Sequence, residues 1–230
     1  KPDMKKQNYS YIGISFIILL FGIIFIPKIL NRINNDGVVD KDRHNLERND
    51  TQNDTLAFIG NKKVPAFQFA NQNGDSISNA DYKGKVYVVE FFFSTCQDIC
   101  PVMNQNMQKV AKAYPGENVG IASISIDPTY DTPEVLKDYA QAYGITHPNW
   151  NFLTGDKEEI FQLSNEGFNL YAAEGMDEED QFQHSGYFAL IDQEGNIRSR
   201  IDENGNPIIY YDGLSEEGVQ MLIEDIEKLL

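Results

Sequence analysis

The residues best suited to chemistry in this sequence are Cys96 and Cys100, which lie four positions apart in the segment STCQDICP. They are the only 2 cysteines in 230 residues. Two thiols at this spacing can oxidise to a disulfide or hold one soft metal ion. A disulfide that closes so short a loop stabilises a fold by only about 2 kcal/mol, so redox or metal chemistry explains the pair better than a structural role.

The cysteine pair lies at a predicted junction between a strand and a helix. The apolar run from Val86 to Phe93, rich in β-branched and aromatic residues, is typical of a central strand buried on both faces. Apolar residues then recur at helical spacing up to Tyr114. Because proline favours the first helical position, Pro101 predicts Cys100 at the N-cap, where the partial positive charge of the helix start favours a thiolate.

A third candidate for the same site is His184, one of only 3 histidines, which precedes a predicted strand. Residues at the ends of neighbouring strands can converge, although spacing alone does not establish that His184 meets the cysteines. Two thiolates and one imidazole form a soft, three-coordinate ligand set suited to copper in either oxidation state, with zinc as the competitor.

Glu90 interrupts the apolar strand six residues before Cys96. Thioredoxins carry a buried carboxylate at the same offset, where it handles the proton of their cysteine pair. A buried acid has a raised pKa and can act as a general base in thiol chemistry, which favours a redox-active pair. The alternative is an ion pair with a lysine such as Lys85.

We expect one domain over residues 64–230, built as an α/β sandwich around a mixed sheet, because predicted strands alternate with helices. The predicted strands are 64–70, 86–93, 119–126, 150–153 and the hairpin 186–192 with 197–201. Beyond the helix at the cysteines, capping residues at Thr132, Asp156 and Ser215 predict helices that reach about 143, 169 and 230.

The N-terminal part predicts a membrane anchor. Residues 9–30 are almost entirely apolar and show no signal-peptide cleavage site, so we expect an uncleaved transmembrane helix after a short cytoplasmic segment, residues 1–8. Residues 31–63 are rich in Asn, Asp and charged residues, as expected for a flexible linker. The domain is expected on the extracytoplasmic, periplasmic side, where a two-cysteine site of this kind has a use. Nearby lysines give little help with orientation.

The formal net charge of −16 argues against nucleic acid as a partner, because nothing would neutralise the phosphates. Acidic residues are spread over several segments of the domain. They serve either the solubility of an exported domain or the docking of a positively charged partner.

Three segments in order resemble the Sco (SenC) family: FFFSTCQDICP, SIDPTYDTP, and HSG followed by LIDQEG. Members are membrane-anchored, thioredoxin-like proteins that help deliver copper to the binuclear copper site of cytochrome c oxidase. The resemblance, which spans residue 64 to the C-terminus, implies copper ligands at Cys96, Cys100 and His184.

The same resemblance identifies Asp127 and Asp131 with the Asp-x3-Asp element of the family. We expect these aspartates to support the ligands or face a partner, with capping of the next helix as the alternative for Asp131. Gln97 departs from the family, which often has proline there, and should loosen the loop between the thiols without removing a ligand.

Two functions follow as hypotheses. The first is a copper metallochaperone that carries Cu⁺ or Cu²⁺ and gives it to the oxidase subunit with the binuclear site, and that also meets other thiol or copper-carrying proteins. The second is a thiol-disulfide oxidoreductase that uses Cys96 and Cys100 as a redox pair with Glu90 as proton acceptor. Oxidoreductases of the thioredoxin class generally use Cys-x2-Cys, so the extra residue weighs against the second. An interaction domain with an incidental disulfide is a third class.

Overall fold

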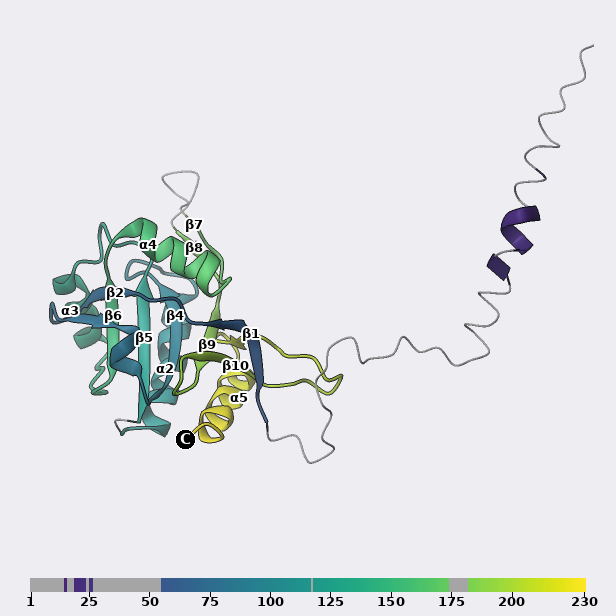
Figure 1. Cartoon of the computed structure of the whole chain (residues 1–230). Coiled ribbons are helices and arrows are strands. Elements are labelled where there is room, and N and C mark those ends of the chain that lie inside the picture. Colours follow the sequence, from purple (N-terminus) through teal and green to yellow (C-terminus); the bar gives the residue numbers. More distant parts are fainter. Residues whose placement is uncertain (1–14, 16–18, 24, 27–54, 117, 174–181) are drawn as a thin grey trace, which may run out of the picture. The chain divides into compact units, whose positions relative to one another are not determined.

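The computed structural model describes residues 15, 19–23, 25–26, 55–116, 118–173 and 182–230 (Figure 1). The chain divides into two units, Lys1–Thr51 and Gln52–Leu230. The few described residues of the first unit, within 15–26, are helical. Across the described parts of the chain, no helix has the length and apolar character needed to cross a membrane. Most of the anchor predicted over residues 9–30, and of the linker predicted over 31–63, lies outside the described residues.

The centre of the second unit is the strand β4 (Val86–Phe92). It pairs in parallel with β5 (Val119–Ser125) and antiparallel with β9 (Tyr187–Ile191), and β5 pairs in parallel with β6 (Trp150–Thr154). Every residue of β4 and β5 is buried, so both faces of the sheet are covered there. The predicted central strand and its parallel neighbour are confirmed.

The sheet extends on both sides of these strands, in the order β1-β10-β9-β4-β5-β6-β2-β3, with β11 paired to β9 (Figure 1). The outer strands are β1 (Ala57–Lys63), β2 (Gln68–Asn71), β3 (Ser76–Ser78), β10 (Asn196–Ser199) and β11 (Tyr211–Asp212). A separate two-stranded sheet joins β7 (Ala172–Ala173) to β8 (Gln183–His184). The mixed sheet with flanking helices is thioredoxin-like, as expected.

The strand β1 corrects the predicted domain boundary, because it lies within the segment expected to be a linker. It pairs antiparallel with β10, and the guanidinium carbon of Arg198 lies 3.9 Å from the centroid of the Phe58 ring. Backbone pairing at a sheet edge and a cation–π contact need few apolar residues, which is why composition alone did not reveal the strand. The sheet therefore starts before Val64, and the strand predicted at 64–70 is displaced to β2.

The helices are α2 (Cys100–Ala113), α3 (Pro133–Ala142), α4 (Lys157–Gln162) and α5 (Glu216–Glu227), with a 3₁₀ turn η2 (Asn79–Tyr82). The pair α2 and α5 pack together, and α3 packs on β6 and β2. The three predicted helix starts are confirmed, because the side chains of Thr132, Asp156 and Ser215 each accept a backbone N–H in the first turn.

The helix predicted to reach residue 169 changes form at Leu163. It continues as the π-helical turn η3 (Leu163–Gly167), which closes with a hydrogen bond of 2.9 Å from the N–H of Phe168 to the carbonyl of Leu163. Side chains of this turn also bond to the chain that follows it: Ser164 donates to the Leu170 carbonyl, and Asn165 donates to the Ala172 carbonyl.

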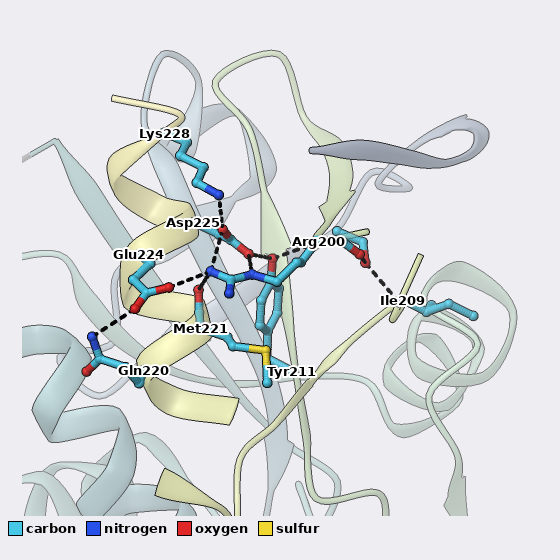
Figure 2. A network of polar contacts seen from close by, with 9 residues as sticks. Arg200, Ile209, Tyr211, Gln220, Met221, Glu224, Asp225 and Lys228 are labelled. Carbon is cyan, nitrogen blue, oxygen red and sulfur yellow. Dashed lines mark hydrogen bonds and ion pairs between the residues drawn. The ribbon is translucent and has the colours of Figure 1, made fainter. Parts of the chain in front are cut away.

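A polar network fixes α5 against the edge of the sheet (Figure 2). The guanidinium of Arg200 donates to both carboxylate oxygens of Asp225, at 2.8 and 2.9 Å, and to Glu224 at 2.8 Å. The Tyr211 hydroxyl and the Lys228 ammonium also contact Asp225, which is fully buried. Burial alone raises the pKa of Asp225, but the hydrogen bonds from Arg200, Lys228 and Tyr211 outweigh it and lower that pKa.

Candidate metal centre

The cysteine loop joins the end of β4 to the start of α2. The prediction that Cys100 is the N-cap is wrong by one residue, because Ile99 already has helical backbone angles and takes the N-cap position without a side-chain cap bond. Cys100 is thus the first residue of the helix, and Pro101 remains in the first turn, where its missing N–H is not needed. Both thiols are free, with Cys100 buried and Cys96 partly exposed.

His184 lies at this junction, although 84 positions separate it from Cys100. The Sγ atom of Cys100 and the Nε2 atom of His184 are 3.0 Å apart. The ligand atoms of Cys96, Cys100 and His184 all lie within 4.8 Å of one another, and among the described residues they form the one such group of three. Ligands about 2.3 Å from a shared ion in a trigonal site are about 4 Å apart. Cys100 and His184 would therefore need to separate by about 1 Å, and no pair would need to close by more than about 1 Å.

The ring of His184 presents its Nε2 atom to the thiols. Its Nδ1 atom is 3.1 Å from the carbonyl oxygen of Ser185. A carbonyl oxygen only accepts hydrogen bonds, so Nδ1 carries a proton, and Nε2 is the ring nitrogen that faces a metal bound between the thiols. A backbone carbonyl that fixes the tautomer in this way is the usual support of a metal-binding histidine.

The short strand that carries His184 is held by Asn165 of the π-helical turn. Ala172 of β7 is the register partner of His184. The Asn165 amide donates to the Ala172 carbonyl at 3.0 Å and accepts the Ala172 N–H at 3.1 Å. Asn165 therefore satisfies both backbone groups of Ala172 and fixes the strand against which His184 is placed.

An aromatic cluster packs against the other side of the histidine. The ring of Phe93, the residue after β4, meets the His184 ring edge to face at 5.8 Å between centroids. Phe182 lies 5.7 Å from Phe93 and continues the cluster to Phe161. The imidazole is thus held by a hydrogen bond to the backbone and by an edge-to-face contact with Phe93, which directly follows the central strand.

The two thiols differ in their protonation. A hydrogen bond from the Cys100 side chain lowers the pKa of Cys96 to about 3, with a further contribution from His184 and against the opposing effect of burial. The same contact and burial raise the pKa of Cys100. A partly exposed thiolate beside a buried thiol can bind a soft cation, or attack a disulfide, through Cys96 first.

Glu90 lies in β4, opposite Ser123 of β5, and is 3% exposed. The Ser123 hydroxyl donates to Oε1 of Glu90 at 2.6 Å, whereas Oε2 is buried with no hydrogen-bond partner. Burial raises the pKa of Glu90 to about 7, and Ser123 and His184 oppose this shift. The alternative of an ion pair with Lys85 is wrong, since Lys85 donates to Asn149 at 3.2 Å instead.

The two aspartates of the Asp-x3-Asp element have different surroundings. Asp131 is fully buried and accepts the backbone N–H of Ser94 at 3.0 Å, together with the hydroxyl groups of Ser94 and Ser125. It does not cap α3, because Thr132 takes that role. Asp127 is half-buried, and burial raises its pKa. Asp131 thus ties the start of the cysteine loop to the end of β5.

Sequence reasoning missed several residues that support this site: Ser94, Asn165, Ser123 and Ser125. The bonding partner of Asn165 lies in another element, so no local pattern marks this residue. The serines at positions 123 and 125 carried one visible signal, because polar hydroxyls inside a buried strand need partners.

The chain matches the model of the SCO1/SenC family over residues 59–217. A SCO1/SenC family lipoprotein from Bacillus anthracis is 36% identical, with a TM-score of 0.63 over 74% of this chain and 95% of that one. BsSco, a member of the Sco family of cytochrome c oxidase assembly proteins, is 30% identical, with a TM-score of 0.61 over 76% of this chain and 96% of its own. Copper-bound ScoI from Bradyrhizobium japonicum is 25% identical, with a TM-score of 0.56 over 74% of this chain and 100% of that one.

The matched region contains the strand β4, the cysteine loop and the two-stranded sheet of β7 and β8 that carries His184. It covers more than half of the chain. This protein therefore belongs to the SCO1/SenC family.

Proposed function

We propose that this protein is a copper metallochaperone that binds one copper ion through Cys96, Cys100 and His184. The observation that carries the proposal is the convergence of two thiols and an imidazole nitrogen within 4.8 Å. Two soft sulfurs and one nitrogen suit copper, and the copper-bound relative supports this choice over zinc. Both thiols must be reduced to bind, so oxidation to a disulfide blocks loading.

Three protein ligands leave copper open to attack by a fourth ligand from another protein, which is what transfer by ligand exchange requires. The recipient in this proposal is the oxidase subunit that carries the binuclear copper site, in line with the oxidase-assembly role named for BsSco. Asp131 supports the site through Ser94. The role we propose for the half-buried Asp127 is contact with a partner protein. The apolar segment 9–30 serves as a single membrane anchor that leaves the domain on the extracytoplasmic side.

Copper titration of the reduced full chain tests the binding step. With a colorimetric Cu⁺ chelator as competitor, we expect one equivalent to bind, and His184→Ala to weaken binding by at least about tenfold. His147→Gln is the matched control, because the His147 ring bonds to the Tyr114 carbonyl at 2.8 Å, away from the thiols. Unchanged affinity in His184→Ala would falsify the three-ligand site.

Two further measurements test delivery and topology. We expect the loaded chain to pass its copper to the purified soluble copper domain of the oxidase subunit. The absorption of the binuclear site, as it forms, measures this transfer. The full chain should stay with the membranes after alkaline extraction, and deletion of residues 1–30 should release the protein from them. Absence of transfer would contradict the proposed recipient, and membrane association that persists without residues 1–30 would contradict the proposed anchor.

A second candidate function is reduction of a disulfide in a partner protein, favoured by the low pKa of Cys96 beside a buried Cys100. The Cys96 thiolate attacks one partner sulfur, and the other leaves as a thiolate. Cys100 then gives up its proton and attacks the Cys96 sulfur, which releases the partner sulfur that was bound to Cys96. Cys96 and Cys100 thus become a disulfide, and the partner gains a dithiol. Glu90 is the proposed proton acceptor. Reduction of a partner disulfide at an unchanged rate in His184→Ala separates this activity from copper delivery.

A further inference from the structure

One end of the sheet exposes a set of large apolar side chains around the candidate metal centre. We name Val102, Tyr130, Tyr171, Tyr187 and Leu214 the apolar rim; all five are exposed. Exposed apolar residues scattered singly are ordinary on a protein surface, whereas a group around a functional site marks a contact surface.

The sheet topology places the elements that carry the rim at one end. The parallel strands β4 and β5 finish there, and β9, which runs antiparallel to β4, begins there. The last residue of β11, Asp212, is the register partner of Tyr187. The first turn of α2, with Val102, follows the cysteine loop directly.

The remaining rim residues are tied to segments that hold the ligands. The Tyr171 carbonyl accepts the N–H of Ser185 at 3.0 Å, next to His184. The Leu214 side chain packs so closely against Gly186 that a Cβ atom there would lie 2.8 Å from Leu214 Cδ1. Tyr130 precedes Asp131, whose carboxylate holds Ser94. The rim residues therefore lie on the segments that carry the thiols and the imidazole, or on segments bonded to them.

The charge around the rim is of one sign. The segments 94–102, 127–134, 168–173, 182–187 and 212–217 contain no lysine or arginine. Besides the fully buried Asp131, their acidic residues are Asp98, Asp127, Glu134, Asp212, Glu216 and Glu217. Lys109 pairs with Glu216, and Lys157 lies over the Phe182 ring at 5.6 Å. Lys137 follows the second segment by three positions. An acidic border complements a basic partner.

We infer that the apolar rim is the docking surface for the recipient of the metal, a folded protein domain that presents its own soft ligands on a basic face. This inference rests on the proposed function. Apolar contact at the rim excludes water from the site during ligand exchange, and the acidic border steers the basic domain into this orientation. A second copy of this chain, with the same acidic border, would be repelled.

The test is the rate of Cu⁺ transfer from the loaded full chain to the soluble copper domain of the oxidase subunit. The double variant Val102→Ser/Tyr130→Ser should keep the Cu⁺ affinity of the unmodified chain, because both side chains are exposed and neither is a ligand. Its second-order transfer rate should fall by about tenfold, and the rate for the unmodified chain should fall as salt is raised. Leu230→Ser, which removes an exposed apolar side chain outside the rim, is the matched control and should transfer normally.

The outcomes separate the surface from the function. Transfer by the unmodified chain that the double variant does not slow, at equal Cu⁺ affinity, overturns the docking surface and leaves the proposed function standing. Absence of transfer by the unmodified chain overturns both. A dimer seen in sedimentation for the unmodified chain and lost in the double variant assigns the rim to self-association and also overturns the inference.

Discussion

Asp131 accepts the backbone N–H of Ser94 at 3.0 Å, and this bond joins the turn after β5 to the residue that opens the cysteine loop. The carboxylate also accepts two serine hydroxyls while fully buried, so every bond it makes lies away from water. A buried carboxylate with three donors rigidifies the loop that sets the position of the thiols.

We expect Asp131→Ala to lower the free energy of unfolding by about 3 kcal/mol, because it leaves a backbone N–H and two hydroxyls without their acceptor. Asp127→Ala should cost less than about 1 kcal/mol, since Asp127 is half-buried and accepts only a long bond of 3.4 Å from Tyr130. Urea unfolding of the reduced protein measures both. Equal losses in the two variants would contradict the role of Asp131.

The buried carboxyl of Glu90 makes stability depend on pH. Its pKa rises from 4.5 to about 7 on folding, so between these values the folded state binds more protons than the unfolded state. The contribution of Glu90 to the free energy of unfolding is therefore fully present below about pH 4.5. It is lost as the pH rises towards about 7, and it does not change further above that pH. The full change is on the order of 3 kcal/mol.

Glu90→Gln should remove that contribution, because the amide does not ionise and can still accept from Ser123. The measurement is urea unfolding of the reduced chain and the variant at several pH values from 5 to 8. The difference between the two proteins isolates Glu90 from other titrating groups. A difference that stays constant across this range sinks the assignment.

Asn165 should influence copper binding without touching copper. Asn165→Ala frees the backbone groups of Ala172 and loosens the strand that holds His184, so we expect Cu⁺ affinity to fall by about tenfold. The Cu²⁺ absorption bands should also shift, whereas a loss of stability alone would leave them unchanged. Gln162→Ala is the control, because Gln162 bonds only to the exposed Glu166 at 3.4 Å.

The network around Arg200 should contribute to the stability of the fold and leave Cu⁺ binding unaffected (Figure 2). Arg200→Met leaves the buried carboxylate of Asp225 without its two-bond partner, so the free energy of unfolding should fall by about 3 kcal/mol. The double variant Arg200→Met/Asp225→Leu should recover part of that loss, because it removes the stranded charge as well. Both should bind Cu⁺ as the unmodified chain does. A larger loss in the double variant would show that the pair, rather than the uncompensated charge, dominates.

Local signals in the sequence predicted most of the framework of the site. The apolar run of β4 and the capping residues at Thr132, Asp156 and Ser215 act over a few positions, so their structural effect can be read directly. Pro101 indicated the helix start to within one residue, because the loop backbone itself becomes helical at Ile99.

Features that depend on distant partners were harder to predict. The polar strand β1 exists because β10 pairs with it, and the π-helical turn bonds to the chain beyond it. The approach of His184 to Cys100 joins residues 84 positions apart. The place of His184 before a predicted strand made it a candidate, and the family resemblance implied its role as a ligand. The sequence contains these residues, but their partners are set by the assembled sheet.

The ligands of the candidate metal centre come from elements of unequal strength. Both sulfurs belong to a junction anchored by the central strand and the first turn of α2, whereas the imidazole belongs to a strand of only 2 residues paired with another of 2. Separation of β7 from β8 would move the His184 ring away and leave both sulfurs in place. A bound ion would then lose its ligands one at a time, at a free-energy cost far below that of unfolding the domain.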